Sequence, residues 1–369
     1  MAGPERGEPP DPGPPLLGQL KDSRFVLDLK GEHAGDSRPG PVGGIGPRPG
    51  PIPCVVLVGR AADAESNELA RFLTRIGIDA VRVVPDDLAG HRAALDISTG
   101  IFSFAERLLR PTVVWERHFS GARPTYGDAS EIFSGNSWTE FVDQIGATAP
   151  VRIPHRRPGL LEQLAEAARL GLATPRTLVG TDPAAAAAAL SGARIVVKSL
   201  GSHFVESEPG LLTGVFAEVR DRAVTIARGG STGPPMVFQE YLEHECELRV
   251  YYVHGEIHAY AVAKPGPAAP WTEPSAVRVC PAPAGAAVQR AARALAGAWG
   301  ADYCAFDFLI RAGEPVFLEA NLNGDWRWFE TVARDRRVTH AAVRMLRDLH
   351  VRAVGGRDGA LGPISFLCG

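Results

Sequence analysis

The sequence predicts an α/β fold in which a parallel α/β domain is followed by a larger α+β part. An apolar strand pattern at Cys54–Gly59 is followed by helical spacing over Glu65–Ile76 and by a second strand at Ala80–Val84. A strand, a helix and a strand in this order are typical of a parallel βαβ unit. Later in the chain, pairs of apolar runs flank short turns that contain Gly, which is typical of antiparallel hairpins.

The first 53 residues differ from the rest in composition. Residues 1–53 contain 11 Gly and 12 Pro and have only short apolar runs. A segment of this kind buries too little apolar surface to offset the entropy lost on ordering. We therefore predict a disordered or loosely attached leader over 1–53.

The α/β domain is predicted over residues 54–150. Thr112–Trp115 is a further strand, and a helix is expected from about Ser137, where Ser137 and Glu140 have the spacing of a capping box.

Two further subdomains are predicted, over 151–235 and 236–350, with a tail over 351–369. In the first, Asp182 followed by Pro183 is a strong helix start, and Ile195–Lys198 reads as a strand. In the second, strands at Glu247–Val253 and Ile257–Ala263 are expected to pair across a His254-Gly255 turn. Helices follow at about 285–298 and 338–349.

The most informative feature is a predicted hairpin at Cys304–Ile310 and Pro315–Asn321, with its turn at Ala312-Gly313. Its apolar runs contain three oxygen-bearing side chains, Asp307, Glu319 and Asn321. Residues two apart on a strand share a face, so Glu319 and Asn321 lie together, and Asp307 joins them if it pairs onto that face. Such a set suits Mg²⁺, which takes carboxylate oxygens together with nucleotide phosphates. The alternative is a half-solvated hairpin with scattered polar residues.

Bulk properties exclude some functions. There are 39 basic and 42 acidic residues, for a net charge of −3, so the chain lacks the polybasic signature of a nucleic-acid-binding protein. No apolar run reaches the roughly 18–20 residues of a membrane helix, and the amino terminus does not resemble a secretory signal. Five cysteines show no metal-type pairing. We expect a soluble cytoplasmic protein with buried thiols, and we leave open whether it forms a homodimer.

Three other places carry candidate binding residues. Lys198 ends a strand before a small-residue loop and can reach a phosphate. Gln239-Glu240-Tyr241-Leu242 ends a strand where main-chain groups can meet an adenine edge. Glu247 and Arg249 alternate on one strand face, where a carboxylate can take ribose hydroxyls and a guanidinium can clamp phosphate. Taken singly, each also fits a solvated strand end or a surface ion pair.

The order of these elements resembles the ATP-grasp superfamily: a strand-end Lys, a QEYL hinge, an ELR strand, and a hairpin with the pattern D…E-x-N. The resemblance covers about 155–330 firmly and 54–350 in outline. Within the superfamily the chain is most similar to the RimK-like branch, and closer still to the microviridin-type (graspetide) peptide maturases. The segments that carry this resemblance are Arg110–Arg117, Gly171–Thr177 and Asn321–Trp328, the last being similar to the family's N-P-x-G-Q-W-x-W segment.

The resemblance implies an ATP-grasp fold with a parallel pre-ATP-grasp domain, and an ADP-forming ligase that activates a carboxylate as an acyl phosphate. By this analogy Lys198 holds phosphate, Glu247 takes the ribose, and Arg249 and Arg278 act on the phosphates or the acyl phosphate. The hinge residues implied to contact the adenine are Gln239, Glu240, Tyr241 and Leu242. The implied Mg²⁺ ligands are Asp307, Glu319 and Asn321.

The chain departs from the family pattern at three places. The family often has Asn-Lys where this chain has His155-Arg156-Arg157-Pro158, so Arg156 or Arg157 must replace a phosphate-binding Lys or the contact is missing. Leu322 replaces a Pro after the last ligand, and Asp325 replaces a Gln before Trp326. The residue types of the metal and nucleotide sites are all retained.

The expected reaction is ester or amide formation on Asp or Glu side chains of a ribosomal precursor peptide, with ATP and Mg²⁺ as cofactors. One alternative is a ligase that joins small amino acid-like carboxylates to amines. A third reading is an ATP-binding regulator without turnover. Both the choice between ester and amide formation and the identity of the substrate stay open at the level of the sequence.

Overall fold

The computed structural model describes residues 26–28, 50–84, 91–118, 129–201, 204–208, 211–229, 232–267, 269 and 273–355. The described chain falls into two compact units. One contains Thr174–His244 and Ala263–Arg278 together with a short amino-terminal strand. The other contains the described parts of Glu32–Ala173, Glu245–Val262 and Val279–Gly369. The predicted subdomain boundaries stay predictions.

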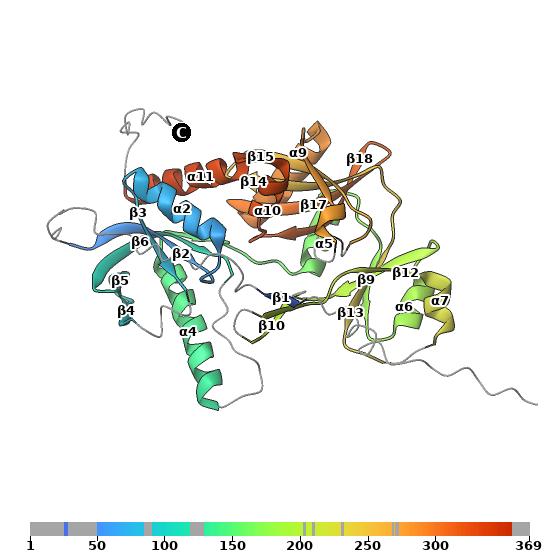
Figure 1. Ribbon diagram of the computed structural model, residues 1–369, viewed down its shortest axis with the longest axis horizontal. Coiled ribbons are helices and arrows are strands. Elements are labelled where there is room, and N and C mark those ends of the chain that lie inside the picture. Colours follow the sequence, from blue (N-terminus) through green and yellow to red (C-terminus); the bar gives the residue numbers. More distant parts are fainter. Residues whose placement is uncertain are drawn as a thin grey trace, which may run out of the picture. The chain divides into compact units, whose positions relative to one another are not determined.

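The larger unit begins with a six-stranded sheet in the order β3-β2-β6-β5-β4, with β7 also paired to β6. Strands β2, β3, β6 and β7 are parallel, whereas β4, β5 and β6 pair antiparallel. Helices α2 and α11 lie over one face and α4 over the other (Figure 1). The bounds are β2 Ile52–Val58, α2 Ala64–Arg75, β3 Asp79–Val83, β4 Ala93–Asp96, β5 Ile101–Phe104, β6 Arg107–Glu116, α4 Ala129–Thr148 and β7 Val151–Ile153.

The predicted βαβ unit is confirmed, because β2 and β3 are parallel neighbours joined by α2. Asp63 caps α2 by accepting hydrogen bonds from the N–H groups of Glu65 and Ser66, both at 3.1 Å. The predicted start of the next helix was wrong. Helix α4 begins at Ala129, so Ser137 and Glu140 lie inside it and form no cap.

A five-stranded sheet in the order β16-β15-β14-β17-β18 completes the larger unit's framework. Its strands β15, β14, β17 and β18 pair antiparallel. Helices α5 and α9 pack on one face, where Phe306, Phe308 and Phe317 belong to a buried cluster with Trp299. The bounds are α5 Leu160–Arg169, β14 Cys246–Val253, β15 Glu256–Ala263, β16 Arg278–Ala282, α9 Ala286–Trp299, β17 Tyr303–Arg311, β18 Glu314–Asn321, α10 Arg327–Ala333 and α11 Arg337–Ala353.

Both predicted hairpins are confirmed. Strands β14 and β15 pair around His254-Gly255, and β17 and β18 pair around Ala312-Gly313. All four turn residues have positive φ, from 47° at His254 to 94° at Gly255. Two successive residues with positive φ make the turn whose twist matches that of the flanking strands.

The smaller unit contains a four-stranded antiparallel sheet in the order β12-β9-β13-β8, covered by α6 and α7. Asp182 caps α6 through hydrogen bonds from the N–H groups of Ala184 and Ala185, as its position before Pro183 predicts. The bounds are β8 Thr177–Gly180, α6 Pro183–Ala189, β9 Arg194–Ser199, β10 Phe204–Glu208, β11 Leu211–Gly214, β12 Glu218–Asp221, α7 Arg222–Ala227 and β13 Met236–Glu240.

Within the predicted leader, the described residues include a strand, β1 (Val26–Asp28), which pairs antiparallel with β11. For these three residues β11 supplies backbone partners from a distant part of the sequence. Most of the leader, and Cys368, lie outside the described residues. Over the described ranges, no helix has the length and apolar character needed to cross a bilayer.

Candidate functional site

A row of charged side chains crosses the five-stranded sheet. Arg249 on β14 lies opposite Asp307 on β17, and Asp307 lies opposite Glu319 on β18. Residues that are directly opposite on neighbouring strands project from the same face. The phenylalanines of β17 alternate with Asp307 and project from the other face into the core. The predicted convergence of Asp307 and Glu319 on one face is therefore present in the strand register.

A β-bulge at Leu318 makes this row possible. Phe308 pairs with Phe317, whereas Asp307 pairs with Glu319, so β18 has one extra residue at this point. Strict alternation would place Phe317 and Glu319 on the same face. The bulge instead lets Phe317 remain in the core while Glu319 lies opposite Asp307.

Asn321 ends β18 two residues beyond Glu319 and therefore shares its face. It lies opposite Ala305. Its side-chain Oδ1 accepts a hydrogen bond from the N–H of Asn323 at 2.9 Å. An amide oxygen has a second lone pair, so this contact leaves capacity for another ligand.

Arg249 holds Asp307 with two hydrogen bonds. Its Nη1 donates to Oδ1 at 3.0 Å and to Oδ2 at 2.8 Å, and only 12% of the Arg249 side chain is exposed. Burial lowers the pKa of the guanidinium, but the charge of Asp307 and the nearby Tyr251 outweigh it and place that pKa well above its usual value. Arg249 is therefore a fixed positive charge beside the two carboxylates.

The donor set on this face fits a hard cation that is shared with a ligand. Two carboxylates and one amide offer oxygen atoms, the ligand type that Mg²⁺ prefers. Among the residues that the structure describes, no group of three or more His, Cys, Asp or Glu side chains is arranged to hold a metal. A cation here would therefore need phosphate or water oxygens as well, as Mg²⁺ in nucleotide sites commonly does.

Glu247 lies two residues before Arg249 on β14 and shares its face. It pairs with Val262 on β15 and with Leu309 on β17. The larger unit thus brings five predicted site residues onto one sheet face: Glu247, Arg249, Asp307, Glu319 and Asn321.

The remaining nucleotide candidates belong to the smaller unit. Lys198 is the fifth residue of β9 and pairs with Val237 on β13. Gln239, only 4% exposed, donates from Nε2 to the Thr177 hydroxyl at 2.8 Å. The Gln239 side chain is thus already bound within the protein.

The residues after Gln239 are also hydrogen bonded. The N–H of Glu240 donates to the Arg176 carbonyl at 3.0 Å. Tyr241 lies under the Arg194 guanidinium, with 4.0 Å between the guanidinium carbon and the ring centre. The Leu242 carbonyl is 2.9 Å from His244 Nδ1.

Three arginines from the sequence analysis have distinct positions. Arg278 begins β16 and is exposed. Arg156 forms an ion pair with Glu162, and Arg157 forms one with Glu116 at 2.6 Å. Arg156 and Arg157, the two candidates to replace the phosphate-binding Lys of the ATP-grasp pattern, are therefore both paired with carboxylates.

Searches for similar proteins gave matches only at the level of structure. The macrocyclase MdnC from Microcystis aeruginosa MRC, solved with precursor peptide MdnA, aligns with a TM-score of 0.64 and 20% identity over 80% of this chain and 99% of that chain. The ATP-grasp ligase PsnB, solved with precursor peptide PsnA2 and AMPPNP, gives 0.63 and 18% over 82% and 100%. The chain has the ATP-grasp fold.

A third ATP-grasp neighbour extends this result. The RiPP-associated ATP-grasp ligase of Chryseobacterium gregarium, solved with ADP and with a leader and core peptide, aligns with a TM-score of 0.61 and 18% identity over 80% of this chain and 97% of that chain. No protein-family model and no curated protein matches the sequence. The predicted ATP-grasp resemblance is confirmed for the fold.

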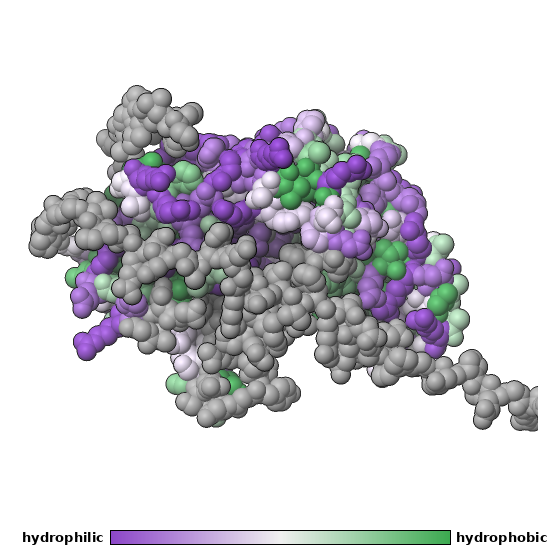
Figure 2. All heavy atoms as spheres, in the orientation of Figure 1, coloured by the Kyte–Doolittle hydropathy of each residue, from purple (hydrophilic) through white to green (hydrophobic). Residues whose placement is uncertain are grey.

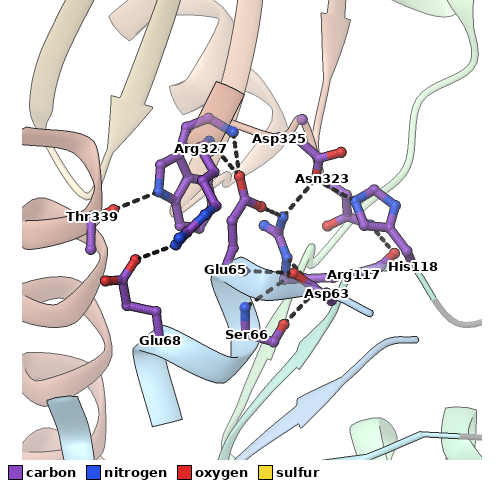
Figure 3. A network of polar contacts seen from close by, with 12 residues as sticks. Asp63, Glu65, Ser66, Glu68, Arg117, His118, Asn323, Asp325, Arg327 and Thr339 are labelled. Atoms are coloured by element: carbon purple, nitrogen blue, oxygen red, sulfur yellow. Dashed lines mark hydrogen bonds and ion pairs between the residues drawn. The ribbon is translucent and has the colours of Figure 1, made fainter. Parts of the chain in front are cut away.

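Sequence reasoning missed a buried polar network around Arg117 (Figure 3). Arg117 follows β6, and its side chain is fully buried. Its Nε donates to Asp63 at 3.1 Å, while its Nη2 donates to Glu65 and, at 2.9 Å, to Asp325. Burial lowers the pKa of Arg117, but the charges of these three carboxylates outweigh it and raise that pKa above its usual value.

The same network caps helix α10. Glu65 Oε1 accepts hydrogen bonds from the N–H groups of Trp326 and Arg327, at 2.6 and 2.7 Å. Burial raises the pKa of the Glu65 carboxyl, while the charge of Arg117 and the N–H of Arg327 oppose the rise. A carboxylate at a helix amino terminus satisfies N–H groups that the helix leaves without partners.

The sequence contained only a weak signal for this network. An arginine after an apolar strand usually marks a solvated strand end, and Asp325 stood out only as a departure from the family's Gln. The partners come from α2, β6 and the segment after β18, which are far apart in the sequence.

Proposed function

We infer that this protein is an ATP-dependent ligase that modifies a ribosomal precursor peptide. The activated group is an Asp or Glu side chain, which ATP converts to an acyl phosphate. A hydroxyl or amine then attacks the acyl carbon, releasing phosphate and leaving an ester or amide. The observation that carries this proposal is the Arg249, Asp307 and Glu319 row, with Asn321 on the same sheet face.

The row suits phosphoryl transfer to a carboxylate. Such a reaction needs little covalent chemistry from the protein and depends on positioning and charge neutralisation. Asp307, Glu319 and Asn321 would hold Mg²⁺, which when bound offsets the negative charge of the phosphates. Arg249 keeps Asp307 oriented through two hydrogen bonds. Its fixed positive charge can also stabilise the acyl phosphate.

The remaining roles follow the family pattern. Lys198 would bind phosphate, and Gln239, Glu240, Tyr241 and Leu242 would line the adenine site. Because the Gln239 side chain is bound to Thr177, its contribution to that site would come through its backbone. Glu247 would take the ribose, and Arg278 would meet the phosphates or the acyl phosphate.

A peptide substrate is supported by the structural neighbours, since MdnC, PsnB and the Chryseobacterium gregarium ligase were each solved with a precursor peptide or its leader and core parts. A small amino acid-like carboxylate would use the same nucleotide chemistry. An activity assay with each kind of substrate distinguishes the two possibilities.

The decisive experiment incubates the protein with ATP, Mg²⁺ and candidate precursor peptides, then measures nucleotide products and peptide mass. We expect ADP and phosphate, and a peptide that has lost one water for each bond formed. Hydroxylamine should trap the activated carboxylate as a hydroxamate, and only when ATP is present. Turnover of small amino acids but of no peptide would favour the alternative substrate. Substrate-dependent AMP and pyrophosphate would indicate adenylation and contradict the proposal.

A further inference from the structure

The loop after β18 is tied to the side chain of Asn321. Asn321 Oδ1 accepts a hydrogen bond from the N–H of Asn323 at 2.9 Å, and the Asn321 carbonyl accepts one from the N–H of Gly324 at 3.2 Å. A side chain that bonds to its own neighbouring backbone takes its orientation from that backbone. The direction of the Asn321 amide therefore depends on where residues 322–325 lie.

Arg117 contacts this loop at two places. Asn323 Nδ2 donates to the Arg117 carbonyl at 3.0 Å, and Arg117 Nη2 donates to Asp325 Oδ1 at 2.9 Å. His118 Nε2 lies 2.8 Å from the same Asp325 oxygen. The hydroxyl of Tyr251 donates to the Asp325 carbonyl at 2.7 Å. Both the backbone and the side chains of the loop are thus anchored.

Arg117 is itself rigidly enclosed. Its guanidinium carbon lies 5.1 Å from the ring centre of Trp115 and 4.6 Å from that of Trp326. Asp63 and Glu65 bind it from α2 (Figure 3). A buried guanidinium that moved away from its carboxylates would leave charges uncompensated in the protein interior, which is strongly unfavourable. The anchor is therefore stiffer than a surface ion pair.

The loop also touches the arginine of the charged row. A Cβ on Gly324 would lie 2.5 Å from Arg249 Nη2 and 2.6 Å from the Ala305 Cβ. Arg249 Nη1 in turn binds both oxygens of Asp307. A displaced loop would consequently disturb the Arg249–Asp307 pair as well as Asn321.

We propose that Arg117, Asn323 and Asp325 are positioning residues for the metal site. By holding residues 322–325 they orient the Asn321 amide before Mg²⁺ and the nucleotide bind. This inference rests on the proposed function, because it takes Asn321 as a Mg²⁺ ligand. In this proposal the three residues contact neither the metal nor the nucleotide. Groups that orient metal ligands commonly contribute about 10–100-fold to metal affinity.

The test separates metal-dependent from metal-independent nucleotide binding. Calorimetry would measure ADP binding to the full chain in EDTA and in Mn²⁺, with Mn²⁺ binding followed independently by electron paramagnetic resonance. Asn323→Ala and Asp325→Asn should each raise the Kd of Mn²⁺ in the presence of ADP about 10–100-fold, and leave ADP affinity in EDTA within about twofold. Arg117 is not substituted, because losing its buried charge would destabilise the fold, and the variant would then report on folding and not on metal binding.

Asp143→Asn is a matched control. Asp143 and Asp325 have side chains with the same exposed fraction, 47%, and each forms an ion pair with an arginine. Asp143 pairs with Arg152 and belongs to α4. Its replacement should leave Mn²⁺ binding unchanged, and thermal melting of all variants would verify that they fold.

Three outcomes would overturn the proposal. Wild-type Mn²⁺ affinity in both loop variants would show that the loop does not orient a ligand. An equal loss of ADP affinity with and without Mn²⁺ would show a general structural role. If the unmodified chain bound neither ADP nor Mn²⁺ with ADP, the proposed function would fail, and this inference would fail with it.

Discussion

Asp307 and Glu319 lie directly opposite each other on adjacent antiparallel strands, and a one-residue bulge at Leu318 makes this pairing compatible with a packed core. Two carboxylates that face each other repel, so such a pair is stabilised by a cation between or beside them. Arg249 supplies one positive charge. We expect Mg²⁺ to supply the other when a nucleotide is bound.

Removing a carboxylate from this pair should abolish the reaction. Asp307→Asn and Glu319→Gln each lose a charge that would neutralise phosphate, so we expect no measurable ADP release in a coupled assay. Asn321→Ala should be severe but less so, because it would remove a proposed ligand that carries no charge. EDTA should stop the wild-type reaction, and excess Mg²⁺ should restore it. If a variant with both Asp307→Asn and Glu319→Gln released ADP at the rate of the wild type, this hairpin would be excluded as the metal site.

Lys198 should affect both ATP binding and turnover, because a charge near phosphate acts in the ground state and in the transition state. The Lys198→Ala variant should raise the KM for ATP and lower kcat. A charged hydrogen bond contributes about 1.5–3 kcal/mol, which corresponds to roughly 10- to 100-fold in kcat/KM. Lys198→Arg, which keeps the charge, should lose less. An unchanged ATP titration for the alanine variant would remove Lys198 from the site.

Replacing Gly324 by Ala should be destabilising, because the added Cβ would lie 2.5 Å from Arg249 Nη2 and 2.6 Å from the Ala305 Cβ. Overpacking of this kind costs about 1–3 kcal/mol. Urea unfolding would measure it. Gly297→Ala is the control: it lies in α9 with nothing within 4 Å of the new Cβ, and should be neutral or slightly stabilising. Equal stability of the two variants would contradict the close approach at Gly324.

Asp63 should contribute to resistance against acid. Burial raises the pKa of its carboxyl, but the charge of Arg117 and the hydrogen bonds from Ser66 outweigh it, so the pKa in the folded protein lies below its usual value. A lowered pKa stabilises the fold above the pKa of the unfolded chain, and this stabilisation is lost as the pH falls through the folded value.

The measurement is the melting temperature as a function of pH. In the wild type it should fall below about pH 4, the pKa of an unfolded Asp. Asp63→Asn should be less stable at neutral pH, by about 3 kcal/mol, because Arg117 loses a buried partner. Its melting temperature should also depend less on pH in the acid range. Parallel pH curves for the two proteins would show that Asp63 is not the titrating group.

Local signals in the sequence predicted most individual elements. The cap of α6 at Asp182 and the turns at His254-Gly255 and Ala312-Gly313 depend on residues within a few positions of each other. Such features are dictated by backbone preferences that neighbouring residues carry. The predicted start of α4 was wrong because it depended on a local signal that is ambiguous. The spacing of Ser137 and Glu140 fits a helix start, but it fits the interior of a helix equally well.

The candidate site was predictable only in part. The identities of Asp307, Glu319 and Asn321 follow from the sequence, because oxygen-bearing residues in apolar strands are conspicuous. The bulge at Leu318 does not, since alternation alone would place Glu319 with Phe317. A core that must bury Phe317 decides the face that Glu319 occupies.

The order of elements along the chain was enough to predict the ATP-grasp fold, and the residue types in the hairpin were enough to predict its oxygen-bearing face. The burial of Arg117 and its pairing with Asp63, Glu65 and Asp325 became visible only in the folded chain. A buried charge needs compensating charges, and these come from whichever elements pack around it. That packing joins α2, β6 and the segment after β18, and no local pattern in the sequence specifies it.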